Sequence, residues 1–426
     1  MMCAGVARKR TIDGRALVCK PSGMGFKWTA LVIAAATSLV GCSDDGVGGP
    51  APGGGAGGSS GGASSSGSSG NSLGSSSGGA SGTIGSSGGS SGSSGNLGTD
   101  GGITGGDSGP LPNGSGLFPS SSFFYQDITG AAVDPAWSQI RTAVDALGGW
   151  GTGAIQVNFE IHILRADASV ARRPFSQDPN NFFVGECDTA PIPVPTAGAI
   201  EAQNNYACDI ANNDCHLIVV QGNRLYEGWR ATIAGGTATG NPFTSGCVAL
   251  WDLTKDYWQP VSGGGVFSRG DHCGSADAGG FPIAAMLFSA DEVAAGEIKH
   301  AIRFIMPNDR IRKDMYVHPA VHAAGSGATD VLPYGARLRL KSTADLSTLK
   351  PWAKVVAKAM QKYGIVLSDG GQQALTAQAD KYTTAKWGTN LTQNDLSAIK
   401  FDDFEMIDGG ARIPRSGNCP HVVITN

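Results

Sequence analysis

The chain of 426 residues has no excess of charge of either sign. It carries 31 Lys and Arg against 35 Asp and Glu, which gives a formal net charge of −4 at pH 7. Proteins that bind nucleic acids or anionic membranes through charge concentrate basic residues in a patch or a run. We therefore expect no nucleic-acid partner.

Several motifs of well-known enzyme classes are also missing. Outside a Gly- and Ser-rich segment, no Gly-x-Ser-x-Gly turn, phosphate-binding loop or dinucleotide-binding glycine pattern occurs in the strand-and-helix context that its chemistry needs. The chain also lacks a Cys-x-x-Cys pair, the usual mark of a zinc or redox site. These absences disfavour hydrolase-fold esterases, NTPases and Rossmann enzymes, and we expect neither a cofactor nor a metal.

The amino-terminal region has the order of features of a bacterial export signal. Basic residues precede an apolar run from Trp28 to Val40, which is shorter than the roughly 20 residues that a membrane-spanning helix needs. The run ends in Leu39-Val40-Gly41-Cys42, which resembles the lipobox of bacterial lipoproteins. The resemblance implies that residues 1–41 are removed and that a lipid on Cys42 anchors the chain in the bacterial cell envelope. Since Ser43 and not Asp follows this cysteine, it also favours the outer membrane.

Residues 42–116 form the next segment, which is dominated by Gly and Ser. From Gly46 to Gly116 it contains no aromatic residue, Lys or Arg. Without apolar side chains, nothing offsets the entropy of ordering the backbone, so we predict a disordered tether with a mean span of about 45 Å. Residues 117–426 are then long enough for a single folded extracytoplasmic domain with its own core.

Six of the cysteines fall in this domain. An even number of cysteines in an exported protein predicts disulfides, here up to three. The sequence does not choose among the possible pairings of these residues, which are Cys187, Cys208, Cys215, Cys247, Cys273 and Cys419.

Alternating apolar and polar residues predict several strands. The longest alternation runs over residues 154–164, and shorter ones cover 297–306 and 336–341. In the segment 336–341, the basic side chains should face water. Residues 216–220 and 225–231 flank a Gly-Asn pair, which predicts a hairpin with a tight turn.

Helices are predicted mainly towards the two ends of the domain. Asp134-Pro135 begins one that ends at Gly148, and a second covers about residues 351–363. Thr392 and Asp395 indicate a third. Many short strands with a few amphipathic helices predict a mainly β domain, either a β-sandwich or a jelly roll with peripheral helices, and an α+β fold is the alternative.

The predicted hairpin holds the first candidate site residues. Asp214 and His216 lie two residues apart, so they share a face of the first strand and can act together on a substrate. On the second strand Glu227 and Trp229 share a face, which suits an acid with a raised pKa or a sugar-binding surface. Tyr226 adds a candidate binding residue beside them. A core position for Trp229 with Glu227 at its rim is the alternative.

A second group of candidates comes from the predicted strand at residues 297–306. Alternation places Glu297 and Arg303 on one face and His300 on the apolar face. Glu297 is a candidate catalytic carboxylate, while His300 and Arg303 are candidate binding residues. A core histidine held by hydrogen bonds is the alternative for His300.

Six short segments carry a further resemblance. They are Asp214-Cys215-His216, Arg224 to Glu227, Ala276 to Ile283, Asp291 to Phe304, Pro333 to Lys341, and Lys362 to Ile365 with Asp369-Gly370. Together they resemble an uncharacterised family of secreted bacterial proteins. The resemblance implies no reaction, but it implies that one constellation recurs, formed by Asp214, His216, Glu227, Glu297, His300 and Arg303. Because family members commonly carry a small residue at position 215, Cys215 is assigned to an additional disulfide and not to the chemistry.

Glycoside cleavage needs two carboxyl groups that flank the scissile bond, one protonated and one ionised. We therefore predict a membrane-anchored, carbohydrate-active domain in which Glu227 and Glu297 form that pair and a polysaccharide is the substrate. A glycan-binding or adhesion lipoprotein without turnover is the alternative, since exposed aromatic residues, among them Trp251, Tyr257 and Trp258, can stack on sugar rings without an acid or base. A metal-dependent hydrolase that uses Asp214, His216, His300 or His318 is the third hypothesis.

Overall fold

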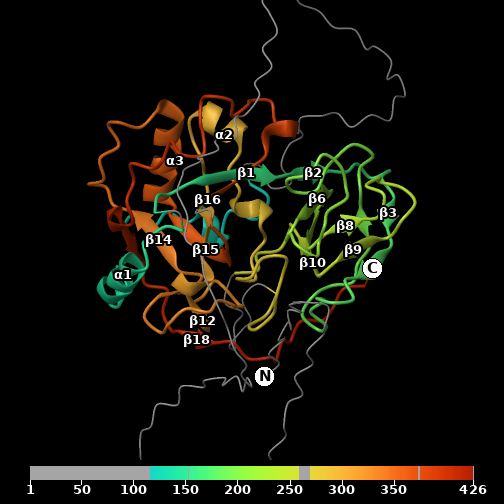
Figure 1. The fold of residues 1–426 in the computed structure, drawn as a ribbon, viewed down its shortest axis with the longest axis horizontal. Helices are drawn as coiled ribbons and strands as arrows, with labels where there is room; N and C mark the ends of the chain where they lie inside the picture. The colour runs from blue at the N-terminus through green and yellow to red at the C-terminus, as the bar shows by residue number, and fades with distance from the viewer. Residues whose placement is uncertain (1–115, 152, 259–268, 373–374, 426) are drawn as a thin grey trace, which may run out of the picture. The chain divides into compact units, whose positions relative to one another are not determined.

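The computed structural model describes residues 116–151, 153–258, 269–372 and 375–425 (Figure 1). The expected signal, Cys42 and the tether up to residue 115 lie outside these residues. The regular structure of the described residues consists mostly of strands in several sheets, with few helices. The prediction of a mainly β fold is confirmed, while the sandwich or jelly-roll arrangement in particular stays a prediction.

The largest sheet has six strands in the order β1-β16-β11-β15-β14-β17. Its strands mix two directions, because β11 lies parallel to β15 and β14 lies antiparallel to β15. The alternation over residues 297–306 predicted β11 too long, since this strand begins only at Ile302. The bounds are β1 Val157–Ile161, β11 Ile302–Met306, β14 Arg337–Leu340, β15 Ile365–Gly370, β16 Leu375–Gln378 and β17 Phe404–Met406.

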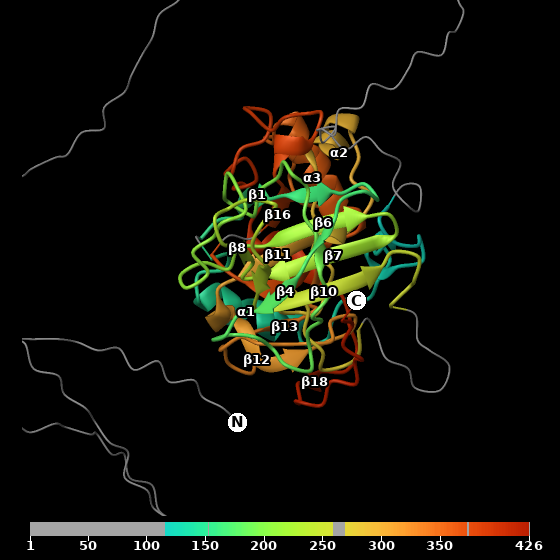
Figure 2. The same cartoon turned by 90° about the vertical axis from the view of Figure 1, so that its right-hand side faces the viewer.

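A second sheet has four strands in the order β10-β7-β6-β2, and Figure 2 shows β6, β7 and β10 side by side. The predicted hairpin is confirmed as β6 and β7, which pair antiparallel from Leu217↔Gly228 to Gln221↔Arg224. Gly222 in its two-residue turn has a φ of 55°, a value that glycine adopts at no steric cost. The bounds are β2 Ile163–Arg165, β6 Leu217–Gln221, β7 Arg224–Trp229 and β10 Cys247–Asp252.

The long alternation over residues 154–164 is divided between these two sheets. β1 pairs with β16 in the six-stranded sheet, and β2 pairs with β6 in the four-stranded sheet. The two strands are separated by His162 alone, and Figure 1 shows them following one another. The chain therefore passes directly from the six-stranded sheet to the four-stranded sheet at His162.

The four-stranded sheet is buried on both faces. Alternate residues of β6 contribute to different hydrophobic clusters: Ile218 and Val220 join the larger cluster, while Leu217 and Val219 join the smaller one. The larger cluster also contains residues of the six-stranded sheet, such as Phe304. Period-two alternation thus places one set of side chains of β6 against the core shared with the six-stranded sheet.

Three α-helices occur in the described parts of the chain. The helix predicted at residues 134–148 is α1, Trp137–Ala146, and the one at 351–363 is α3, Pro351–Lys362, which contacts β14. The sequence did not reveal α2, Ala290–Ala295, which Ser289 and Glu292 cap reciprocally. The third predicted helix is wrong: residues 392–398 form turns, in which Asp395 accepts a hydrogen bond from the Thr392 amide.

Three small sheets and several 3-10 helices complete the described structure. The sheets have the orders β13-β12-β18, β3-β5 and β4-β9-β8. Their strands are β3 Arg172–Arg173, β4 Phe175–Gln177, β5 Ile192–Pro193, β8 Thr232–Ile233, β9 Phe243–Ser245, β12 Ile311–Tyr316, β13 Leu332–Tyr334 and β18 Ile413–Pro414. The 3-10 helices are Phe123–Tyr125, Ala284–Met286, Asn308–Arg310, Asp380–Tyr382 and Phe401–Asp403.

The expectation that the arginines of residues 336–341 face water is wrong. Arg337 and Arg339 are both buried in β14. Arg337 donates to the carbonyl oxygens of Phe123 and Tyr363, and Arg339 forms an ion pair with Glu405. A buried guanidinium is tolerated where its fixed fork of donors finds acceptors, and here the irregular chain from 123 to 131 supplies most of them.

The prediction of three disulfides is confirmed. The pairs are Cys187–Cys247, Cys208–Cys215 and Cys273–Cys419. Disulfides persist in oxidising compartments, so these bonds fit an extracytoplasmic location. None of the helices in the described part of the chain has the length and apolar character that crossing a membrane requires.

Candidate functional site

A buried cluster of charged side chains lies where β11 and β15 run side by side. Arg303 of β11 donates from Nε and Nη2 to the two carboxylate oxygens of Asp277, at 3.2 Å each. Its Nη2 also lies 2.9 Å from an oxygen of Asp369 on β15. The Arg303 side chain is only 3% exposed and that of Asp277 is fully buried, whereas Asp369 keeps 22% of its side chain exposed. Of these three side chains, Asp369 is therefore the one that solvent or a ligand can reach.

An irregularity in the pairing of β11 and β15 brings Asp369 to the side of Arg303. Phe304 pairs with Leu367, but the next residue of β11, Ile305, pairs with Asp369 and not with Ser368. Since neighbouring residues of a strand point to opposite faces, this one-residue shift moves Asp369 onto the face of Ile305 and Arg303. A regular ladder would have placed the carboxylate on the opposite face.

The loop that carries Asp277 is bound to β15 at the same irregularity, through Ser368. The Gly279 amide donates to the carbonyl oxygen of Ser368 at 2.7 Å. A Cβ at Gly279 would lie 3.1 Å from that oxygen and 2.9 Å from the Phe281 ring, so a residue without a side chain is required for this close approach. The Asp277 loop and β15 are thus joined next to Asp369.

Burial changes the protonation of both carboxyl groups. It raises the pKa of Asp277 to about 7, although Arg303 opposes the rise. Burial also raises the pKa of Asp369 above its ordinary value, again against Arg303, and the negative charge of Asp214 adds to the rise. The site therefore contains a partly exposed carboxyl group that retains its proton to a higher pH than an ordinary aspartate.

His216 adds a positive charge beside this cluster. Its Nδ1 lies 2.6 Å from Glu201 and its Nε2 lies 3.1 Å from the carbonyl oxygen of Ala276. Both partners are acceptors, so both ring nitrogens donate and the imidazole is protonated. Burial lowers the pKa of His216, but the charge and hydrogen bond of Glu201 outweigh burial and raise it overall. His216 therefore positions Ala276, next to Asp277, and is not free to act as a general base.

Two adjoining pockets open at this cluster. The smaller has a volume of about 240 Å³ and is lined by His216, Arg303 and polar residues of β1 and β16. The larger has a volume of about 410 Å³ and is lined by Asp277, Trp229 and Tyr334, among others. Asp214, Asp369 and Gly370 line both pockets. Two carboxylates thus stand where the two pockets meet.

Aromatic side chains form one wall of the larger pocket. Trp229 is partly exposed at the end of β7, and its ring lies 5.8 Å from that of Phe183, measured between centroids. Phe183 is 42% exposed, which is unusual for a large apolar side chain. Tyr334 lies behind this wall, since it borders the pocket but is only 1% exposed. Such a wall suits the apolar face of a ring-shaped ligand.

The structure thus brings together four of the eight residues that the sequence proposed. Asp214, His216 and Arg303 line the smaller pocket, and Asp214 and Trp229 line the larger one. Arg303 was expected on the polar face of its strand, opposite His300, and the structure shows it buried there among carboxylates.

Glu227 and Tyr226 are buried within the four-stranded sheet, and the expectation that Trp251 and Trp258 are exposed is wrong, because both are buried as well. One oxygen of Glu227 accepts from the Trp251 indole at 3.0 Å, and the other accepts from the Ala284 amide at 2.9 Å. Burial raises the pKa of Glu227 to about 7. The raised pKa that the sequence suggested is present, but the side chain is fully buried and joins the sheet to the 3-10 helix at Ala284–Met286.

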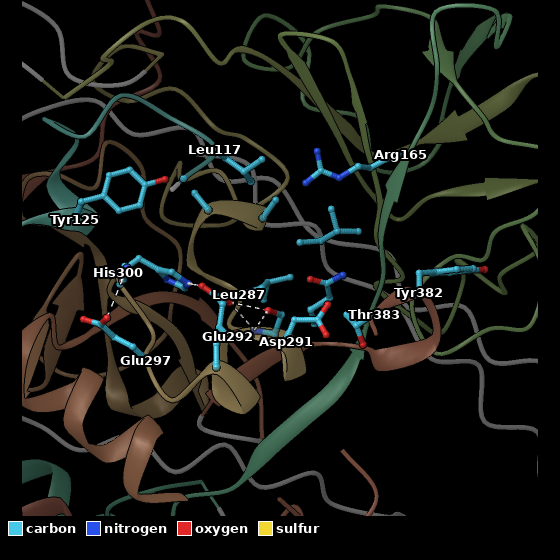
Figure 3. A pocket seen from close by; sticks show the side chains of 18 residues that line it. Leu117, Tyr125, Arg165, Leu287, Asp291, Glu292, Glu297, His300, Tyr382 and Thr383 are labelled. Carbon is cyan, nitrogen blue, oxygen red and sulfur yellow. Dashed lines mark hydrogen bonds and ion pairs between the residues drawn. The ribbon is translucent and has the colours of Figure 1, made fainter. Parts of the chain in front are cut away.

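Glu297 and His300 line a third pocket of about 490 Å³ (Figure 3), and none of the residues of the cluster lines it. His300 contacts Glu292 through Nε2 at 3.1 Å and the carbonyl oxygen of Ala301 through Nδ1 at 2.8 Å. His300 is therefore a buried histidine held by hydrogen bonds, as the alternative interpretation of the sequence had it. Since Glu297 lines this pocket and Glu227 has no exposed surface, the structure does not bring the two glutamates together as a pair of catalytic carboxylates.

Sequence reasoning missed three residues of the cluster: Glu201, Asp277 and Asp369. Asp277 and Asp369 lie in two of the segments that carry the family resemblance, so that signal was available. Glu201 lies in an irregular segment with no periodic pattern, and nothing in the sequence marked it. Among the residues that the structure describes, no group of three or more His, Cys, Asp or Glu side chains is arranged to hold a metal ion.

Comparisons with known proteins add no further information on this site. No family model, no curated protein and no solved structure matches this chain. The geometry of the two pockets is therefore the basis for inferring what the domain does.

Proposed function

We propose that the domain cleaves glycosidic bonds of an extracytoplasmic polysaccharide in the cleft formed by the two adjoining pockets. The observation that carries this proposal is the pair Asp214 and Asp369, which line both pockets and differ in environment. Glycosidases need one carboxyl group that donates a proton and a second that is ionised. In this cleft the two roles have separate candidates.

Asp369 is the general acid in this proposal. Burial raises its pKa, so it holds a proton at a pH where ordinary aspartates are ionised, yet part of its side chain remains exposed. It donates that proton to the glycosidic oxygen as the bond to the anomeric carbon breaks. Arg303 fixes the orientation of the carboxyl group through Nη2.

Asp214 is the second carboxylate. It is exposed beside Asp369 at the junction of the pockets. It either removes a proton from the attacking water or attacks the anomeric carbon itself, and the configuration of the product distinguishes the two. Inversion at the anomeric carbon indicates a base, and retention indicates a nucleophile.

The test is hydrolysis of a panel of polysaccharides by the full-length protein in detergent, followed by the same assay on Asp369→Asn and Asp214→Asn. Each substitution is expected to lower turnover about 100-fold or more. Asp127→Asn is the matched control, because Asp127 is an exposed aspartate in a turn that Asn can also form. Cleavage that survives both site substitutions, or no cleavage of any polysaccharide, would refute the proposal.

A second candidate function is glycan binding without turnover. Asp277 and Asp369 are both held by Arg303, and a buried ion network of this kind can serve structure alone. The aromatic wall with Trp229 and Phe183 would then bind sugar rings by itself. Retention on an immobilised glycan that is lost in Trp229→Ala but kept in Asp369→Asn, together with absence of cleavage, supports this alternative.

We also propose that the chain is a lipoprotein of the bacterial cell envelope, anchored through Cys42 and sorted to the outer membrane. The order of basic residues, apolar run and Leu39-Val40-Gly41-Cys42 supports this proposal. Incorporation of a labelled fatty acid that Cys42→Ser abolishes, with recovery of the wild type in the outer-membrane fraction, is the expected result. An unlabelled wild-type protein would refute it.

A further inference from the structure

The position of Asp214 and Asp369 between two pockets has a consequence for the kind of chain that the cleft accepts. An enzyme that removes single sugars from a chain end needs space on one side of the scissile bond for one sugar only. Here both carboxylates are shared by a pocket of about 240 Å³ and one of about 410 Å³. Both acids therefore border two pockets that substrate can enter.

We propose that the cleft binds a polysaccharide along its length and cleaves it internally, and that the sugars of this polysaccharide are neutral or carry amino groups. This inference rests on the proposed function and specifies its substrate. The chain passes from the larger pocket, over Asp369 and Asp214, into the smaller pocket.

The two pockets recognise sugars by different chemistry. The larger one offers the rings of Trp229 and Phe183, which are at least partly exposed and can stack on the apolar face of a sugar. The smaller one offers amide side chains, which suit the hydroxyl groups at a sugar's edge. These side chains are Asn158, Gln203 and Asn213. The aromatic side supplies most of the binding energy in this arrangement.

The charges of the lining exclude sugars that carry carboxylates. Each basic side chain that lines the two pockets already contacts an acid of the described structure. Arg303 contacts Asp277 and Asp369, His216 contacts Glu201, and His322 and Arg415 both contact Glu186.

The remaining charged groups of the lining are acidic. Glu160 and Asp214 line the smaller pocket, and Asp214 and Asp314 line the larger one. All three are exposed, so their negative charges face the cleft. A uronic-acid polymer would bring its carboxylates against these charges without a free cation to compensate, whereas neutral sugars are tolerated and protonated amino groups are attracted.

The experiment compares laminarin, xylan, mannan and chitosan with the anionic polymers polygalacturonate and alginate, using the full-length protein in detergent. End-labelled oligosaccharides of the substrate that is cleaved are then tested at increasing length. We expect internal fragments as the first products, a rate that rises with length until both pockets are filled, and no cleavage of the anionic polymers. Trp229→Ala should raise KM for the longer oligosaccharides about tenfold, while Asp127→Asn changes neither KM nor the product pattern.

Two classes of outcome separate this inference from the proposed function. Release of single sugars from the first time point, a rate independent of chain length, or preferred cleavage of an anionic polymer overturns the inference and leaves glycoside cleavage in place. Absence of cleavage of every polymer, or cleavage that survives Asp369→Asn and Asp214→Asn, overturns the proposed function and the inference with it.

Discussion

Arg303 donates two hydrogen bonds to Asp277: Nε and Nη2 each lie 3.2 Å from a different oxygen of its carboxylate. The same Nη2 lies 2.9 Å from Asp369, so one guanidinium fixes two carboxyl groups that come from separate parts of the chain. Because Asp277 has no exposed surface, water cannot compensate its charge. The geometry of the cleft therefore depends on this one cation.

Removal of the Arg303 charge is predicted to destabilise the domain strongly. Arg303→Met keeps much of the side-chain volume but leaves Asp277 buried without its partner, and such changes cost about 3–5 kcal/mol of the free energy of unfolding. Chemical denaturation monitored by tryptophan fluorescence measures this cost. The double variant Arg303→Met with Asp277→Leu removes both charges and should be clearly more stable than the single variant. If the double variant is the less stable of the two, the buried pair is not what the single substitution disrupts.

A second prediction concerns the glycine at which the Asp277 loop meets β15. Gly279→Ala places a Cβ against the Ser368 oxygen and the Phe281 ring, and overpacking of this kind costs about 1–3 kcal/mol. Gly417→Ala is the matched control, since nothing lies within 4 Å of a Cβ at that position. The control should change the free energy of unfolding by less than about 0.5 kcal/mol. Equal stabilities of the two variants would show that the loop can move away from β15.

Local pattern predicted the elements whose residues interact with near neighbours. The hairpin of β6 and β7 follows from two alternating runs and a Gly-Asn turn, and α3 follows from an apolar stripe that begins at Pro351. Each depends on residues that are close in sequence, so periodicity and turn chemistry were sufficient.

The features that make the cleft come from long-range packing. Period two indicates that Arg303 faces the side opposite Phe304, but it does not reveal that another part of the chain covers that side. The register shift at Ser368, which places Asp369 on the side of Arg303, cannot be predicted from the hydrophobic pattern. Glu201 pairs with His216 from an irregular segment. In each case the partner was set by tertiary contacts, which a single sequence does not show.

The disulfides are predicted to contribute unequally to stability. In the chain-entropy account, a bond stabilises more when it closes a longer loop. Cys273–Cys419 closes a separation of 146 residues and Cys208–Cys215 one of 7, for which that account gives about 5 and about 2 kcal/mol. Guanidinium denaturation of Cys273→Ser/Cys419→Ser and of Cys208→Ser/Cys215→Ser, both with the other bonds oxidised, tests the order. A larger loss for the short loop would contradict it.

The last prediction separates a structural from a catalytic role for Glu227 through the pH dependence of stability. Burial raises the pKa of Glu227 from 4.5 to about 7, so between these values the folded protein keeps a proton that the unfolded chain has lost. Its contribution to stability is therefore fully present below pH 4.5 and is lost as the pH rises to about 7. The shift corresponds to about 3 kcal/mol across that window.

Glu227→Gln removes this proton equilibrium. As the pH rises from 4.5 to 7.5, the unfolding free energy of the wild type should therefore fall by about 3 kcal/mol relative to that of Glu227→Gln. Denaturation at each pH measures both values. Glu297→Gln is the control, because the Glu297 side chain is 53% exposed, and this variant should keep the slope of the wild type. Any glycoside cleavage should persist in folded Glu227→Gln, since the side chain joins Trp251 to Ala284 inside the core. Loss of turnover without loss of stability would instead return Glu227 to the catalytic role that the sequence first gave it.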